Sequence, residues 1–146
     1  MKTIEFTVHG PIHGKGRPRF TRVGQYVRTY TPDQTISYEN LIKMEYLEEN
    51  EGFMFGREVP LAIKITAFYE VPKSASQRKK AEMLADKIRP LKKPDSDNVL
   101  KVVCDALNGV AYHDDVQIVS VQVERFYALN PFLDVVLWEV GSEDGL

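Results

Sequence analysis

Two aspartates, a lysine and a further pair of aspartates follow one another between Lys93 and Gln117, in the run KPDSDNVLKVVCDALNGVAYHDDVQ. Carboxylate oxygens are the ligands that a hard divalent cation such as Mg²⁺ prefers, and such a cation can hold and activate a phosphodiester. The types and order of these residues therefore predict an active site for metal-dependent chemistry on a phosphodiester.

The first half of this run is predicted to be a helix from about Asp95 or Asp97 to Leu107. Apolar residues recur at helical spacing, at Val99, Val102, Val103, Ala106 and Leu107. The aspartates before them are good N-cap residues, and Asn108-Gly109 is a typical helix stop. With 3.6 residues per turn, Asp97, Lys101 and Asp105 fall on the face opposite the apolar stripe.

The second half of the run belongs to another element. Val119, Val121 and Val123 alternate with polar residues, as in a half-buried strand, and Asp114 and Asp115 lie at its start. These two acids reach the helix only if the loop after Leu107 turns back across it, which about seven residues allow. The sequence leaves this closure open.

Each of these acids also has a purely structural interpretation. Single acids near helix starts are usually caps, and an Asp-Asp pair before a strand is usually a turn. Asp105 and Asn108 are expected to be structural. The whole set favours a site, because three or more like charges brought together cost stability unless a cation neutralises them.

The run resembles the signature of the RusA family of Holliday junction resolvases (crossover junction endodeoxyribonucleases). In that family Asp-x-Asp-Asn-x-x-Lys is followed by Asp-Ala-Leu and, after a short gap, by Asp-Asp-x-Gln. The likeness covers about residues 92–119, and the segment GKGRPRF, residues 14–20, looks like the basic N-terminal segment of phage-type members.

This resemblance implies roles for particular residues. Asp95, Asp97 and Asp115 match the metal-binding carboxylates, Lys101 matches the essential lysine, and Asp114 is a further candidate ligand. It also implies a homodimer, because two symmetric nicks across a junction require two sites.

The charges are segregated although the net charge is only −2. Residues 11–30 contain five bases and no acid, and residues 71–93 contain eight bases and two acids. A charge run is more often a solvated surface, but basic segments on both sides of an acidic centre suit a nuclease that holds phosphates at its flanks. The candidate DNA contacts are Lys15, Arg17, Arg19, Lys92 and Lys93.

The remaining patterns predict one small α/β (α+β) domain, residues 1–146, with a mixed sheet flanked by helices. We expect a strand over Ile4–Val8, a basic loop over Gly10–Gly24, a helix capped by Thr31 from Pro32 to about Asn50, a strand over Leu61–Ala67, a helix opened by Ser74–Gln77 and ending near Asp86, and two final strands, 117–128 and 132–140, joined as a hairpin. On the first helix, Tyr38, Leu41, Met44 and Leu47 are expected in the core.

Composition narrows the classes further. With 43% hydrophobic and 27% charged residues, no membrane-length apolar run and no signal peptide pattern, a soluble cytoplasmic protein is expected. The single cysteine, Cys104, is expected to be a packed thiol. The three histidines lack the paired spacing of a zinc site, and Gly14-Lys15-Gly16 lacks the spacing of a nucleotide-binding loop.

We therefore expect an endodeoxyribonuclease that resolves four-way DNA junctions with Mg²⁺, for which Mn²⁺ can substitute. One alternative is a non-catalytic protein that binds junctions or other branched DNA and uses the acids for structure. Another is an enzyme that uses them for Mg²⁺-nucleotide chemistry. The intact set of acids and lysine favours catalysis, and the missing phosphate loop counts against the nucleotide enzyme.

Overall fold

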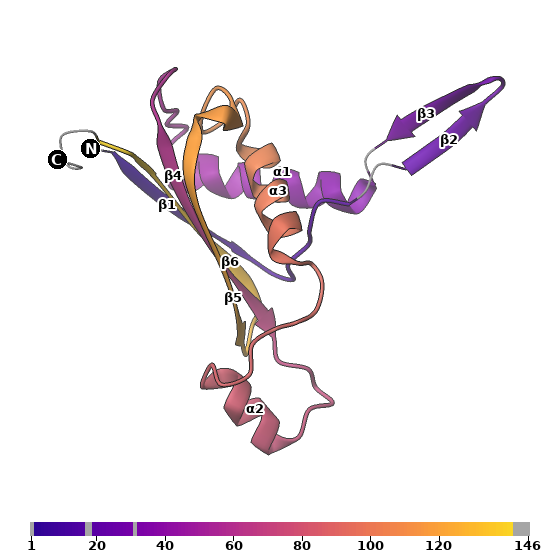
Figure 1. Ribbon diagram of the computed structural model, residues 1–146, viewed down its shortest axis with the longest axis vertical. Helices are drawn as coiled ribbons and strands as arrows, with labels where there is room; N and C mark the ends of the chain where they lie inside the picture. The colour runs from indigo at the N-terminus through magenta and orange to yellow at the C-terminus, as the bar shows by residue number, and fades with distance from the viewer. Residues whose placement is uncertain (1, 17–18, 31, 142–146) are drawn as a thin grey trace.

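The computed structural model describes residues 2–16, 19–30 and 32–141, and shows an α+β domain with a mixed four-stranded sheet (Figure 1). The elements are β1 (Thr3–His9), β2 (Arg19–Val23), β3 (Tyr26–Tyr30), α1 (Asp33–Glu49), β4 (Leu61–Glu70), α2 (Gln77–Leu84), α3 (Ser96–Leu107), the 3₁₀ turn η1 (Asp115–Gln117), β5 (Ile118–Ala128) and β6 (Phe132–Glu139). The predicted fold class is confirmed, as are the strands β1 and β4 and the motif helix α3.

The main sheet has the strand order β1-β6-β4-β5. β6 runs antiparallel to both β1 and β4, and β5 runs parallel to β4. On β4 the alternate residues Leu61, Ile63, Ile65 and Ala67 are fully buried. These residues face α1 and α3, which lie on the same side of the sheet (Figure 1).

The predicted hairpin between the last two strands is wrong, because β4 lies between β5 and β6. The connection over residues 129–131 passes the end of β4 and spans two strand spacings, roughly 10 Å, which three extended residues can bridge. β4 has more buried residues than any other strand of the sheet, and a central place covers both of its edges.

The predicted basic loop over Gly10–Gly24 is also wrong in its second half. Residues 19–30 form an antiparallel hairpin, β2-β3, that is separate from the main sheet and projects from it (Figure 1). Gly24 supplies the positive φ of 62° that the tight turn needs.

Helix α1 differs from its prediction in its start and in its buried face. Pro32 occupies the N-cap position without a side-chain cap, and the predicted cap Thr31 lies outside the described residues. Tyr38 is buried as expected, but Met44 and Leu47 are exposed, and the other buried residues are Thr35, Ile42 and Tyr46. The buried stripe is therefore displaced from the predicted one, because Tyr46 rather than Leu47 faces the sheet.

Helix α2 packs against β5 at the end of the sheet, away from α1 and α3 (Figure 1). It begins after Ser76, whose hydroxyl accepts from the Lys79 N–H at 3.2 Å, so Ser76 is the N-cap within the predicted opening segment. No helix within the described part of the chain is both long and apolar enough to span a membrane.

Candidate active site

Helix α3 carries one acidic face and one buried face. Its buried residues are Val99, Val102, Val103, Ala106 and Leu107. Asp95 is the N-cap, and its Oδ1 accepts from the Asn98 N–H at 3.0 Å. Because the apolar stripe fixes the rotation of the helix against the sheet, Asp97, Lys101 and Asp105 are turned toward a cleft.

The loop before α3 is fixed to the sheet by side chains of β4 and β5. The Tyr69 hydroxyl donates to the Pro94 carbonyl at 2.6 Å, and Arg125 Nη1 donates to the carbonyls of Lys92 at 2.8 Å and Pro94 at 3.2 Å. These bonds hold the residue directly before Asp95. The start of the acidic motif is therefore positioned by the sheet and not by α3 alone.

A cleft of about 300 Å³ lies between α3 and the start of β5. Its polar lining is Asp97, Lys101, Asp105 and Asp115, and its apolar floor is Leu100, Cys104, Ile118 and Val121. The loop after Leu107 thus does turn back across α3. The cleft brings together three of the four predicted catalytic side chains, with Asp105 added.

The turn that carries Asp114 and Asp115 is held by Gln117. Gln117 Oε1 accepts from the N–H groups of His113 at 2.9 Å and Asp114 at 3.2 Å, and its Nε2 donates to the carbonyls of Gly56 at 3.0 Å and Val59 at 3.1 Å. Asp114 Oδ1 accepts from the Val116 N–H at 3.1 Å. Asp114 is therefore a cap of the turn, while Asp115 lines the cleft.

The carboxylates of this region repel one another. The pKa of Asp115 lies above its ordinary value, first because partial burial disfavours the charged form, and then because of a hydrogen bond with Asp114 and the negative charges of Asp114 and Asp105. The cleft thus holds negative charge that its own residues do not fully neutralise.

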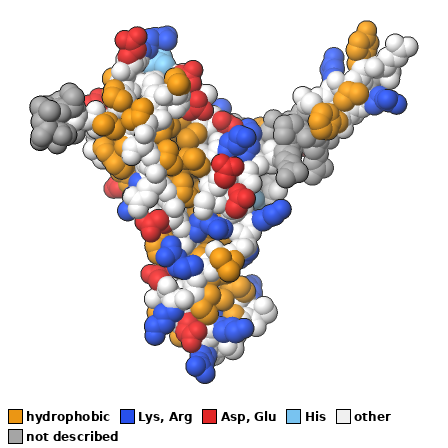
Figure 2. Space-filling model, viewed as in Figure 1, with side chains coloured by type: hydrophobic (Ala, Val, Ile, Leu, Met, Phe, Trp, Pro, Cys, Tyr) orange, Lys and Arg blue, Asp and Glu red, His pale blue; other side chains and the backbone are white. Residues whose placement is uncertain are grey.

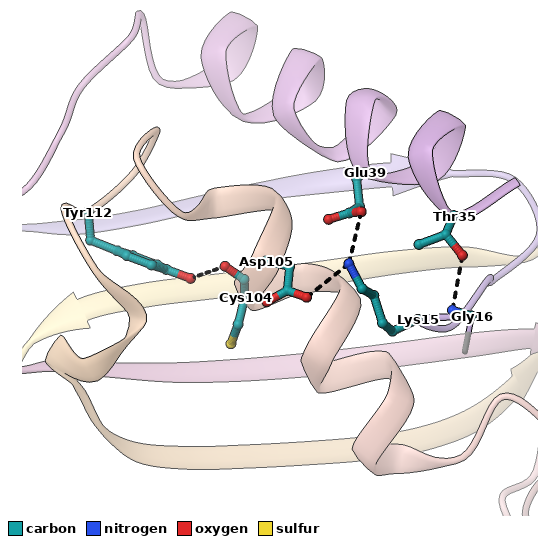
Figure 3. A network of polar contacts seen from close by, with 7 residues as sticks. All are labelled: Lys15, Gly16, Thr35, Glu39, Cys104, Asp105 and Tyr112. Carbon is teal, nitrogen blue, oxygen red and sulfur yellow. Dashed lines mark hydrogen bonds and ion pairs between the residues drawn. The ribbon is translucent and has the colours of Figure 1, made fainter. Parts of the chain in front are cut away.

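Lys15 supplies part of the neutralisation from outside the cleft. Its Nζ lies 3.1 Å from Asp105 Oδ2 on α3 and 3.3 Å from Glu39 Oε1 on α1 (Figure 3). Burial lowers the pKa of Lys15, but the hydrogen bonds and charges of Asp105 and Glu39 outweigh it, so the pKa is raised overall. Lys15 is also a predicted DNA contact; in the structure its ammonium is paired with these two carboxylates, and the DNA contact stays a prediction.

Two glycines allow the chain to bring Lys15 between the helices. A Cβ on Gly14 would lie 2.6 Å from Pro94 Cβ, and one on Gly16 would lie 2.7 Å from Thr35 Oγ1. The Lys15 N–H donates to the Asn98 carbonyl at 3.1 Å, and the Gly16 N–H donates to Thr35 Oγ1 at 3.0 Å (Figure 3). This segment is therefore packed tightly against α3 and α1.

Asp105 and Glu39 are site residues that the sequence did not identify as functional. Asp105 was expected to be structural, although its spacing from Asp97 and Lys101 already placed it on their face. Nothing in the sequence links Glu39 to α3, since the link passes through Lys15. Among the described residues Lys101 makes no ion pair, which distinguishes it from Lys15.

A second and larger cleft, of about 620 Å³, adjoins the other side of the α3 N-terminus. Asp95 and Asn98 line it together with Lys93 and the Gly14–Gly16 segment. Asp95 therefore faces a different hollow from Asp97. The two clefts therefore lie on different sides of the N-terminal end of α3.

Of the predicted DNA contacts, Lys15 and Lys93 line the larger cleft. Lys93 is exposed at the larger cleft, and exposed Lys92 places its Nζ 5.9 Å from the ring centres of both Tyr69 and Tyr127. Arg17 lies outside the described residues. Arg19 begins strand β2, and its side chain is not described.

Cys104 lies at the floor of the smaller cleft but is not suited to be a nucleophile. Burial raises its pKa to about 11, so the thiol is protonated at neutral pH. The Tyr112 hydroxyl donates to the Cys104 carbonyl at 2.6 Å and holds the loop against α3 (Figure 3). The prediction of a packed thiol is confirmed.

The donor chemistry of the smaller cleft suits a hard cation. Within residues 2–16, 19–30 and 32–141, no three His, Cys, Asp or Glu side chains stand close enough to form a complete metal cage. Mg²⁺ is usually bound by one or two carboxylates, with water and substrate phosphate as its other ligands. Asp97 and Asp115, which line the same cleft, are carboxylates of the kind that such a site uses.

An acidic cleft beside a lysine, on a mixed sheet with two helices on one face, fits a metal-dependent phosphodiesterase. A sequence comparison narrows this class, because the family described as "Endodeoxyribonuclease RusA" matches residues 9–137. The chain therefore belongs to the RusA family of endodeoxyribonucleases. It is also similar to the uncharacterized protein YqaN of Bacillus subtilis (strain 168), with 33% identity over 145 residues, which cover 97% of this chain and 100% of that protein.

Proposed function

We propose that this protein is a Mg²⁺-dependent endonuclease that resolves four-way (Holliday) DNA junctions by paired nicks during recombination and repair. The observation that carries the proposal is the convergence of Asp97, Lys101 and Asp115 from two elements on one cleft, in a chain of the RusA family. The partner is branched DNA, and the expected location is the cytoplasm.

Asp97 and Asp115 would hold the metal ion, and Asp95 at the neighbouring hollow is the third proposed ligand. Asp114 is a further candidate, and its carboxylate caps the turn just as that of Asp95 caps α3. When bound, Mg²⁺ or Mn²⁺ would activate water and stabilise the charge that develops on the phosphate. Burial first, and then Asp114 and Asp105, raise the pKa of Asp115, and a bound cation would favour the charged form of this carboxylate.

Lys101 is the residue proposed to contact the scissile phosphate. It lies one turn after Asp97 on the same face of α3 and has no carboxylate partner among the described residues. A cation fixed on a helix can stabilise charge that appears on the phosphate or the leaving oxygen in the transition state. Lys15 cannot do so in the same way, because it is already paired with Asp105 and Glu39.

The test is cleavage of a labelled four-way junction and of a linear duplex with the same arm sequences, with and without Mg²⁺. We expect paired nicks near the branch point of the junction, only with Mg²⁺, and an intact duplex. Asp97→Asn keeps the shape of the side chain but removes a ligand charge, so it should abolish nicking while junction binding persists.

The control is Asp33→Asn in the first turn of α1, which should cut like the wild type. Junction binding without nicking in any divalent cation would favour the non-catalytic binding protein instead. Equal cutting of junction and duplex would leave a nuclease without selectivity for branches.

A further inference from the structure

The β2-β3 hairpin contributes no described side chain to the core of the domain. Each side chain described between Phe20 and Thr29 is exposed, and none belongs to the core. The hairpin does not pair with the main sheet and extends away from it (Figure 1). Two-stranded hairpins are marginally stable alone in water. We therefore expect a bound ligand to stabilise this hairpin when the protein functions.

The hairpin exposes large apolar side chains beside arginines. Phe20 is 71% exposed, Tyr26 77% and Val27 58%. Arg22 and Arg28 are exposed too, and residues 11–30 contain no acid. Figure 2 shows the same pattern, with hydrophobic and basic side chains along the projection and no acidic ones. An anionic ligand with flat apolar surfaces would satisfy both kinds of side chain.

The strand register divides these residues between two faces. Directly paired residues share a face and neighbours along a strand alternate, so the pairs Phe20↔Thr29 and Arg22↔Val27 lie on one face and Thr21↔Arg28 on the other. Tyr26 joins Arg28 by the same alternation. Among the side chains that the structure describes, each face therefore presents one arginine and one aromatic ring.

This two-sided arrangement favours nucleic acid over a protein partner. A hairpin that docks on a protein surface would gather its apolar residues on one face and leave the other polar. DNA at a branch point offers phosphates and the flat faces of unstacked bases on more than one side. Aromatic side chains stack on such bases, arginines pair with the phosphates, and a two-stranded ribbon has the width of a major groove.

We propose that the hairpin is an arm that enters the branch point of the DNA, with Phe20 and Tyr26 stacked on bases and Arg22 and Arg28 on phosphates. This role rests on the proposed function and adds to it the means by which the protein distinguishes branched from linear DNA. Because the hairpin contributes nothing to the core, substitutions on it should leave the fold unchanged.

The test compares Phe20→Ala/Tyr26→Ala with Arg22→Gln/Arg28→Gln, in Ca²⁺ to prevent cutting. The aromatic double variant should bind the junction on the order of tenfold more weakly, with unchanged affinity for linear duplex. The arginine double variant should lose roughly 1.8 from the slope of log affinity against log salt, because each phosphate contact accounts for roughly 0.9. The controls are Met44→Ala and Arg57→Gln, exposed residues outside the hairpin.

A fluorescent base provides a second readout. With 2-aminopurine at the branch point, wild-type protein should change its fluorescence and the aromatic double variant should not, whereas 2-aminopurine within an arm should respond to neither. Suppose that the wild type prefers junctions and that both double variants keep this preference and the wild-type salt slope. The proposed role of the hairpin is then overturned, while the proposed function stands. If the variants change only the oligomeric state in sedimentation, the arm contacts protein. A wild type without preference for junctions would overturn the branched-DNA function itself.

Discussion

The two lysines beside the acidic cleft differ in what their charges face. Lys15 is enclosed by carboxylates from α1 and α3, whereas Lys101 projects into the cleft without an ion-pair partner among the described residues. A paired lysine contributes to the fold, and an unpaired one is available to a phosphate. Both residues are lysines, but their surroundings give them different roles.

Substitution of Lys101 separates catalysis from binding. If Lys101 stabilises the transition state, Lys101→Ala should lower the single-turnover cleavage rate on the order of 10²-fold and change junction affinity by less than about twofold. The measurement is single-turnover cleavage with titration of the same junction in Ca²⁺. Lys43→Ala on α1 is the control. Equal losses of rate and affinity would make Lys101 an ordinary phosphate contact.

Asp115 predicts a dependence of stability on pH. Its pKa is raised in the folded protein, so the folded state holds its proton more tightly than the unfolded state does. The resulting stabilisation is present below the ordinary aspartate pKa and is lost as the pH rises through the raised value. At pH 7 in EDTA, Asp115→Asn should therefore be more stable than the wild type, and the difference should shrink toward pH 4.

Urea unfolding at the two pH values measures this effect. The control is Glu70→Gln, which replaces an exposed acid. Mg²⁺ should stabilise the wild type more than Asp115→Asn, since the ion would neutralise the same carboxylate. A variant less stable than the wild type at both pH values would show that Asp115 supports the turn instead of straining it.

At the scale of elements, the site depends on a segment that crosses between α1 and α3. Gly14 and Gly16 permit the close approach, and Lys15 then links Glu39 to Asp105 (Figure 3). The side chains of Glu39 and Asp105 are only 15% and 32% exposed, so they depend on this lysine for neutralisation. The ion pairs thus connect the N-terminal segment to the helix that carries the acids.

Removal of this link should cost stability. Lys15→Met keeps the length of the side chain but leaves two partly buried carboxylates without a cation, so we expect a loss of about 1–3 kcal/mol in the free energy of unfolding at pH 7. Urea denaturation measures it. The exposed Lys73→Met is the control and should lose less than about 0.5 kcal/mol. If Lys15→Met is as stable as the wild type, the ion pairs do not stabilise the fold, and DNA contact is the remaining role of Lys15.

At the scale of the whole molecule, most bases are concentrated in two segments, residues 11–30 and 71–93. Figure 2 shows basic side chains over the region of α2 and acidic ones nearer the middle. The hairpin and α2 project from different ends of the main sheet (Figure 1). DNA held by both regions would pass over the acidic centre.

The second basic region can be tested independently of the hairpin. Lys92→Gln/Lys93→Gln should weaken binding to junction and duplex alike and lower the salt slope by roughly 1.8, because phosphate contacts carry little information about structure. Affinities at several salt concentrations in Ca²⁺ measure this. The control is Lys43→Gln on α1. An unchanged slope would leave Lys92 and Lys93 as solvated residues of the loop.

The sequence by itself determined the elements whose patterns are local. The apolar period of α3 and its capping residues were sufficient to place Asp97, Lys101 and Asp105 on one face, because each helical turn depends only on neighbouring residues. The alternation in β1 and β4 was equally decisive. For the same reason the acidic motif could be recognised and matched to a family without a structure.

The tertiary structure decided which distant segments meet. Only the packed fold places β4 between β5 and β6, returns Asp115 to α3, and gives Lys15 its two carboxylates. It also showed that residues 19–30 form a projecting hairpin. These features depend on competition among distant segments for the same partners, and the local spacing of apolar residues carries no information about it. Strand order and long-range ion pairs follow from the arrangement that buries the most apolar surface.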